Sequence, residues 1–178
     1  LDATLTELER NLPSDIAAIW LLDQDDIYCA AVHGASAADL NTARYVSPDA
    51  GAALARALLA RQPIVRRPGE PMGPSGVVGG FADDYSSIAA PLRIGDQALG
   101  ILTLAHHTPG RYGHEAHAMT TTFASYAAVA IENARLYDSA QEQAYASAAL
   151  LQVAQAVVSL SELDEILGTI VRILPILV

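Results

Sequence analysis

Residues 86–107 read SSIAAPLRIGDQALGILTLAHH, and this stretch decides the fold. Two apolar runs, at residues 85–93 and 98–107, flank the pair Gly95–Asp96. Apolar runs of this length are typical of strands, and a Gly-Asp pair between them favours a tight turn. The stretch therefore predicts a β-hairpin.

After the hairpin the pattern changes from strands to one long helix. Residues 111–115 read RYGHE and residues 123–137 read FASYAAVAIENARLY. Apolar residues recur at spacings of three and four as far as Val158, and residues 115–159 contain neither Pro nor Gly. The pattern predicts a helix over 115–159, which is longer than a typical globular helix.

Together these two segments resemble the C-terminal half of a GAF domain. In that family a strand ends in Pro-Leu, a Gly turn and a Gly-initiated strand follow, an aromatic-x-x-Glu sequence starts a helix, and the final helix carries Ala-Ile-x-Asn-Ala-x-Leu-Tyr. The matching positions here are Pro91-Leu92, Gly95, Gly100, 112–115 and 130–137.

The resemblance covers about residues 1–137 and implies an α+β fold. A GAF/PAS-like fold has a central antiparallel sheet of five or six strands with the terminal helices on one face. A helix and a loop cover a small-molecule pocket on the other face, and here a long C-terminal helix follows. Such domains are usually sensory or regulatory modules of signalling proteins.

The first half of the chain fits this order of elements. Apolar spacing predicts a helix over residues 1–12, and the runs 16–23 and 27–34 around an acidic turn predict a first hairpin. Ser47 followed by Pro48 predicts a helix start, with the helix reaching Arg61. A brief strand at 63–65 then leads into residues 66–80, a Gly/Pro-rich loop without periodicity.

Composition excludes several classes of function. The chain has 178 residues, 52% hydrophobic and 17% charged, which is too apolar for a disordered protein. Its net charge of −10 disfavours nucleic acid as a partner. All ten basic residues are Arg, so no lysine is available for Schiff-base or phosphate-loop chemistry. The single Cys29 excludes a disulfide framework, a thiolate metal cluster and dithiol catalysis.

We predict neither an enzyme nor a membrane protein. No Ser-His-Asp order, paired carboxylates or phosphate-cradling loop is found. The uncharged, largely apolar stretch at residues 145–160 is too short for a membrane span, so a cytoplasmic location is expected.

The loop and the strand after it contain the candidate ligand residues. Two arginines at the loop start can select an anionic ligand, and polar groups before and in the next strand border the expected pocket. The alternatives are solvated loop arginines and an ordinary surface turn. The predicted ligand-binding residues are Arg66, Arg67, Phe81, Asp83, Asp84, Tyr85 and Ser87.

No cofactor or metal is assigned. Cys29 is not followed by His, as a bilin-attachment cysteine commonly is, and is expected to be a buried, inert thiol. The Asn-Lys-x-Phe-Asp-Glu signature of cyclic-nucleotide-binding relatives is absent. Four histidines lie within twelve residues and are interpreted as solvent-exposed or capping groups, with a metal or haem site as the alternative: His106, His107, His114 and His117.

The long helix predicts a homodimer. One domain cannot bury its whole length, so the half beyond Tyr137 needs a partner, most simply the same helix of a second chain. The alternative is a helix folded back at Ser139 or Ser159. The predicted dimerisation residues are Ala130, Ala134, Tyr137, Gln141, Ala144, Ala148 and Leu151.

Two functional hypotheses follow. The first is a sensory module that binds a small molecule and transmits the event through the helix pair. The alternative is a ligand-free dimerisation platform whose pocket is filled by its own side chains, such as Met72, Val77 and Phe81.

The two ends of the chain repeat each other. Residues 1–13 and 163–175 share six identities at a constant offset of 162, among them Leu1-Asp2 with Leu163-Asp164. This predicts a tandem of GAF-like modules that continues past Val178, against the alternative of chance similarity between two helices. The expected organisation is a GAF domain at 1–137, a signalling helix at 138–161 and the first helix of a second module at 162–178.

Overall fold

A computed structural model of the chain describes residues 1–24 and 26–177, with the side chains of 2–3, 157–162, 164, 169 and 172–177 outside the description. The chain forms five helices and five strands in these residues. In order they are α1 (Asp2–Asn11), β1 (Ile16–Asp23), β2 (Asp26–His33), α2 (Ala37–Val46), α3 (Pro48–Leu59), β3 (Ile64–Val65), α4 (Pro74–Gly79), β4 (Ser86–Ile94), β5 (Gln97–His106) and α5 (His114–Leu177).

The strands form one antiparallel sheet in the order β2-β1-β5-β4-β3. Both predicted hairpins, β1–β2 and β4–β5, are confirmed. The two hairpins join where β1 pairs with β5, and the contact is close at Gly100, where a Cβ atom would lie 2.0 Å from the carbonyl oxygen of Trp20. Glycine at this position therefore lets the central strands approach.

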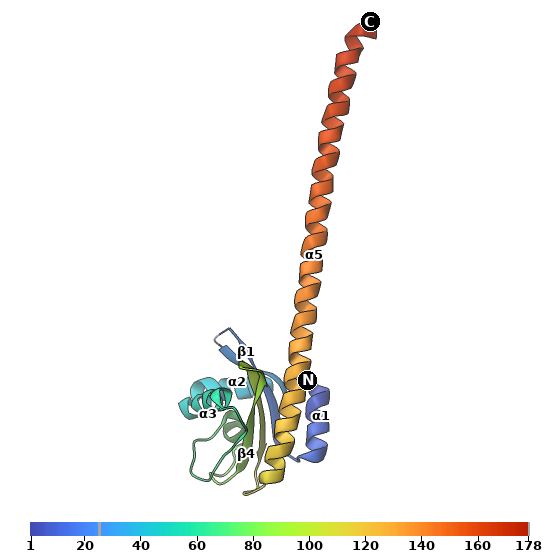
Figure 1. Cartoon of the computed structure of the whole chain (residues 1–178). Coiled ribbons are helices and arrows are strands. Elements are labelled where there is room, and N and C mark those ends of the chain that lie inside the picture. Colours follow the sequence, from blue (N-terminus) through green and yellow to red (C-terminus); the bar gives the residue numbers. More distant parts are fainter. Residues whose placement is uncertain (25, 178) are drawn as a thin grey trace. The chain divides into compact units, whose positions relative to one another are not determined.

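Helices cover both faces of the sheet, as expected for the α+β fold (Figure 1). On one face α1, through Leu5 and Leu8, and the first part of α5, through Ala127 and Ile131, pack against the sheet in one apolar core. On the opposite face Leu40 of α2 and residues of α3 pack around strand residues in a second core. The predicted placement of the terminal helices on one face is confirmed.

The structure differs from the sequence prediction between the first hairpin and β3. One helix was predicted there, from Ser47 to Arg61, but α2 precedes it as a separate helix. Ser47 ends α2 and also caps α3, with its Oγ accepting from the backbone N of Ala50 at 3.4 Å. Because α2 buries only Leu40 and Ala43, its apolar periodicity is too weak to predict a helix from the sequence.

The predicted loop at 66–80 also contains a short helix, α4. It starts with Pro74 at its first turn and ends at Gly80, whose φ of 59° is left-handed. Six residues are too few to show a period in the sequence, so only the Pro and Gly at its two ends could have signalled it.

The chain divides into two compact units, Leu1–Glu132 and Asn133–Val178. Helix α5 was predicted to end near Ser159 but extends to Leu177. Of the predicted second-module segment 162–178, the backbone up to 177 is helical, whereas Val178 lies outside the described residues. Among the described residues, no helix is long and apolar enough to cross a membrane.

Candidate functional site

A pocket lies between the sheet and the α3–α4 side of the first unit. Its empty space is about 520 Å³ counted with its solvent-open mouth, and about 50 Å³ of this can hold the centre of a water molecule. The walls come from α3, β3, the loop and the adjoining strands. The lining residues include Ala53, Leu54, Arg56, Ala57, Ile64, Arg66, Ser75, Tyr85, Ser87 and Thr103.

Arg66 is a buried cation in the wall of this pocket, with only 4% of its side chain exposed. Its Nε donates to the carbonyl of Pro71 at 3.3 Å, and Nη1 donates to the carbonyls of Asp83 at 2.8 Å and Tyr85 at 3.3 Å. Nη2 donates to the carbonyl of Glu70 and to the Asp83 carboxylate at 3.1 Å. Because a guanidinium has five N–H donors, all five are engaged by the protein. Arg66 therefore connects residues 70–71 to residues 83–85, the segments on either side of α4 in the loop beside the pocket.

Tyr85 also holds this loop in place through contacts with Arg66 and Gly73. Its ring lies under the Arg66 guanidinium, 4.4 Å from the Cζ atom to the ring centroid, and its hydroxyl accepts from the backbone N of Gly73 at 3.0 Å. A Cβ atom on Gly76 would lie 2.5 Å from the Tyr85 ring, so α4 can rest on the ring only because residue 76 is glycine. Tyr85 is 1% exposed, and it orders the loop as well as lining the pocket.

Two of the lining residues carry a hydroxyl group without a hydrogen-bond partner within the described part of the chain. They are Ser75, which is 5% exposed, and Ser87, which is half-buried. The other two hydroxyls of the lining are engaged: that of Tyr85 accepts from the backbone N of Gly73, and that of Thr103 accepts from the Trp20 indole N–H at 3.0 Å and donates to the carbonyl of Ala18 at 3.4 Å. Ser75 and Ser87 are therefore the two lining hydroxyls without a protein partner among the described residues, and they can orient a ligand.

The other predicted ligand residues lie around the pocket rather than in its lining. Arg67, Asp83 and Asp84 are exposed on the loop. Phe81 is half-buried, and its ring packs against Tyr85 with the ring centroids 5.6 Å apart. Sequence reasoning missed Ser75, because it lies in a segment without periodicity, and Thr103, whose position inside an apolar strand is its only signal.

The four histidines separate into different environments. The ring of His107 lies 2.6 Å from Asp15, from its Nδ1 to Oδ2, and stacks on the ring of His106. Nδ1 of His106 accepts from the backbone N of Thr108 at 3.0 Å, so this nitrogen is engaged. One ligand atom each from Asp15, His106 and His107 lies within 4.8 Å of the other two, and the hydrogen bonds described here already engage Asp15 Oδ2 and the Nδ1 atoms of both rings. His117 lies on α5, where its Nε2 is 3.1 Å from the carbonyl of Pro63.

Asp15 connects this pair of histidines to the start of β1. Burial raises the pKa of Asp15, but hydrogen bonds from the backbone and ring of His107 and the charge of His106 lower the pKa, and the net pKa lies below its ordinary value. The carboxylate therefore stays charged at neutral pH and fixes the end of β5 beside β1.

Cys29 lies in β2 and is 6% exposed. Burial raises the pKa of its thiol to about 11, only partly offset by the hydrogen bond to the carbonyl of Ala31. Since the thiolate is the reactive form, we expect the folded protein to react with Ellman's reagent far more slowly than a free cysteine up to about pH 9. Guanidinium-unfolded protein is the control, and equal rates in the two states would show that the thiol is accessible.

The model of the family described as the GAF domain matches residues 1–132, three quarters of the chain. The chain belongs to the GAF domain family. The match ends at the boundary between the two compact units.

Solved GAF structures share this fold at low sequence identity. The GAF domain/HD domain protein from Geobacter sulfurreducens is 20% identical, with 76% of this chain and 94% of that chain covered and a TM-score of 0.56. The GAF domain of a two-component sensor histidine kinase from Bacillus halodurans is 16% identical, with 78% and 97% covered and a TM-score of 0.54. The GAF-B domain of DevS from Mycobacterium smegmatis is 18% identical, with 77% and 93% covered and a TM-score of 0.55. Comparison with the curated proteins finds no significant match.

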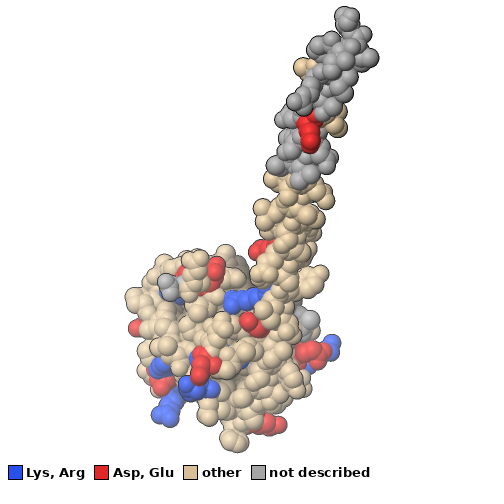
Figure 2. Space-filling view, turned by 45° about the horizontal axis from the view of Figure 1, so that its top comes forward, with Lys and Arg blue, Asp and Glu red and all other residues tan. Residues whose placement is uncertain are grey.

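Helix α5 presents the predicted dimerisation residues on its surface. All seven are exposed: Ala130, Ala134, Tyr137, Gln141, Ala144, Ala148 and Leu151. Figure 2 shows few charged side chains on the described surface of the second unit, and residues 143–156 contain none. An apolar, uncharged helix surface of this kind is what a partner helix can cover.

Proposed function

We propose that the chain is a sensory module that binds a small molecule in the pocket behind Arg66 and transmits the event through a dimer of α5. In this proposal residues 1–137 form the GAF domain, 138–161 the signalling helix and 162–178 the first helix of a second module. The similarity to the GAF domains of sensor histidine kinases supports a role in signal transduction. Binding would change the balance between two arrangements of the helix pair.

The observation that carries the ligand half of the proposal is the pair of unpartnered hydroxyls, Ser75 and Ser87, in an otherwise largely apolar pocket. A polar group that faces a pocket without a protein partner is satisfied by water or by a ligand. A ligand that satisfies both hydroxyls and covers apolar atoms of α3 and β4 would gain both kinds of interaction.

The same geometry indicates a small, neutral ligand. The predicted contact between Arg66 and an anion stays a prediction, and it would require Arg66 to give up one of its five hydrogen bonds. Arg56, the other cation of the lining, is 3.4 Å from Glu70. With the cations paired and little free space, a neutral molecule with a few hydrogen-bonding atoms fits better than a nucleotide.

A ligand screen by thermal shift, with mass spectrometry of the intact complex for the hits, tests this proposal. Ser75→Ala and Ser87→Ala each remove one hydroxyl, and each is expected to weaken the best neutral ligand by about 3- to 10-fold. Ser139→Ala, an exposed serine on the second unit, is the matched control and should leave the affinity unchanged. A ligand that binds both pocket variants with unchanged affinity does not bind at these hydroxyls.

The alternative function, a dimerisation platform without a ligand, is favoured by one observation. The space open to water-sized molecules, about 50 Å³, holds only a few waters as the pocket stands. The sequence predicted that Met72, Val77 and Phe81 fill the pocket. None of the three is among the lining residues that the structure describes. A complete absence of ligand shifts together with a stable dimer would support this alternative.

A further inference from the structure

A second concave site lies at the edge of the sheet in the first unit, away from the pocket behind Arg66. This edge notch, as we call it, has about 370 Å³ of empty space including its opening. Three segments form it, namely the chain before β3, the end of β4, and α5. The lining residues are Arg61, Pro63, Ala90, Pro91, Arg93, Thr121, Ala124 and Ser125.

The notch exists because β3 is too short to cover its neighbour. Strand β3 pairs with β4 only at Ile64 and Val65, opposite Ala89 and Ile88. Before Ile64 the chain contains Pro63, which has no N–H to continue the ladder. The edge of β4 beyond Ala89 is therefore not covered by a strand among the described residues.

This open edge does not favour the addition of a peptide strand. The backbone N–H and C=O groups of residues 87, 89 and 91 in β4 point toward the β3 edge. The hydrogen bond from the Arg66 backbone N to the Ser87 carbonyl establishes this alternation. Pro91 thus puts a residue without an N–H on the open edge, a common way to prevent strand pairing. The notch is instead defined by its side chains.

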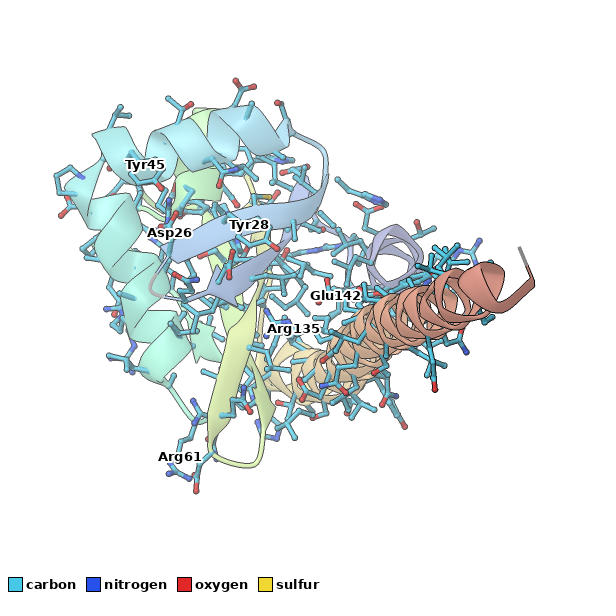
Figure 3. All side chains as sticks on the ribbon, turned by 90° about the horizontal axis from the view of Figure 1, so that it is seen from above. Asp26, Tyr28, Tyr45, Arg61, Arg135 and Glu142 are labelled. Atoms are coloured by element: carbon cyan, nitrogen blue, oxygen red, sulfur yellow. The ribbon has the colours of Figure 1, made fainter. Side chains whose placement is uncertain are left out.

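The two arginines of the notch lining both contact Asp96, which lies in the β4–β5 turn next to the notch. Nη2 of Arg61 lies 3.0 Å from the Asp96 carboxylate, and Nη2 of Arg93 donates to the Asp96 carbonyl. In Figure 3 the Arg61 side chain lies beside the turn that joins β4 and β5, where Asp96 is located. Nη1 of Arg93 also approaches the carbonyl of Leu58, at 3.5 Å.

The donors of these two arginines are mostly unused. Two guanidinium groups carry ten N–H donors, and within the described residues three hydrogen bonds engage them. Arg66, by contrast, has all five of its donors engaged. The Asp96 carboxylate pairs with Arg61, whereas Arg93 contacts only backbone carbonyls and has no carboxylate partner among the described residues, so its charge is uncompensated in a protein of net charge −10.

The contact between Arg61 and Asp96 is easily displaced. The side chains are 79% and 86% exposed, and exposed ion pairs contribute little to stability. An oxyanion held by both guanidinium groups would engage more donors, in the forked geometry that arginine favours. The hydroxyls of Thr121 and Ser125, on the α5 wall of the notch, can donate to the same anion by rotating away from their backbone acceptors.

We propose that the edge notch is a binding site for a small oxyanion, such as a phosphate group, and that Asp96 occupies the arginines when no anion is bound. The site is independent of the proposed sensory pocket and would serve as a second input to the same domain. Arg61 and Arg93 bind the anion, and Asp96 competes with it.

The test is a titration of the full chain with inorganic phosphate at constant ionic strength, followed by ¹H–¹⁵N NMR. We expect saturable shifts in about the millimolar range at the amides of Ala90, Arg93, Thr121 and Ser125. Arg61→Gln and Arg93→Gln should each weaken binding by about fivefold, and Asp96→Asn should strengthen it by a similar factor.

Matched controls separate this site from general charge effects. Arg10→Gln removes the same charge from an arginine that is 69% exposed and paired with Glu7, and Asp84→Asn removes an exposed carboxylate outside the notch. Both should leave phosphate affinity unchanged. Adding methyl phosphate in a parallel titration distinguishes free phosphate from a phosphate ester as the preferred form. Shifts that do not saturate, or equal weakening by Arg10→Gln and Arg61→Gln, would overturn the proposal.

Discussion

Replacing Arg66 with methionine is expected to lower the free energy of unfolding by about 3 kcal/mol, a large part of the stability of an ordinary domain. Methionine keeps much of the length and the apolar stem, but it donates no hydrogen bond. The carbonyls of Pro71, Asp83 and Tyr85 would then lose the cation that joins them. The Asp83 carboxylate, 75% exposed, can return to water and adds little to the cost.

The neighbouring arginine provides the control for this prediction. Arg67 has the same side chain and the same charge, but it is exposed, so Arg67→Met should change the unfolding free energy by less than about 0.5 kcal/mol. Arg66→Lys keeps the charge with three donors in place of five and should lie between the two. Equilibrium unfolding in urea measures all three variants.

Limited proteolysis adds a local measurement to the same experiment. Because Arg66 joins residues 70–71 to residues 83–85, its loss should release this loop first and expose it to cleavage while the sheet remains folded. If Arg66→Met and Arg67→Met unfold at the same urea concentration and are cleaved at the same rate, the buried guanidinium does not hold the loop.

The sheet could be predicted from sequence because its signals are local. Each hairpin consists of two apolar runs around a turn, and the residues that form it are neighbours in the chain. Helix α3 was found for the same reason, since Ser47 and Pro48 mark its start. Helix α2 was missed because only Leu40 and Ala43 are buried, and two residues do not establish a period.

The candidate site was less predictable because it depends on contacts between distant residues. The sequence indicated Arg66 and Tyr85 as ligand-binding residues. In the structure the Arg66 guanidinium instead donates to the backbone carbonyl of Tyr85, nineteen positions away. Which hydroxyls remain without partners depends on pairings such as Trp20 with Thr103, eighty-three residues apart. Local patterns therefore identified the loop as important without revealing how its donors are used.

The second large effect is expected on the oligomeric state. In the proposed dimer Ala144 lies in the middle of the seam with Tyr137 and Leu151, so Ala144→Arg would place two positive charges against each other in a covered interface. Like charges in contact across an interface cost several kcal/mol, so we expect the dimer dissociation constant to rise by about 100-fold or more. Analytical ultracentrifugation over a range of concentrations measures this change.

Ala146→Arg is the matched control, because the substitution, the charge and the exposure are the same two residues away. At 100° per residue Ala146 is turned about 200° from Ala144, which places it on the opposite side of the helix. The control should therefore remain a dimer, whereas Ala144→Arg becomes a monomer. A monomeric wild-type chain, or equal dissociation of both variants, would mean that this stripe is not the seam, and transmission through a helix pair would lose its structural basis.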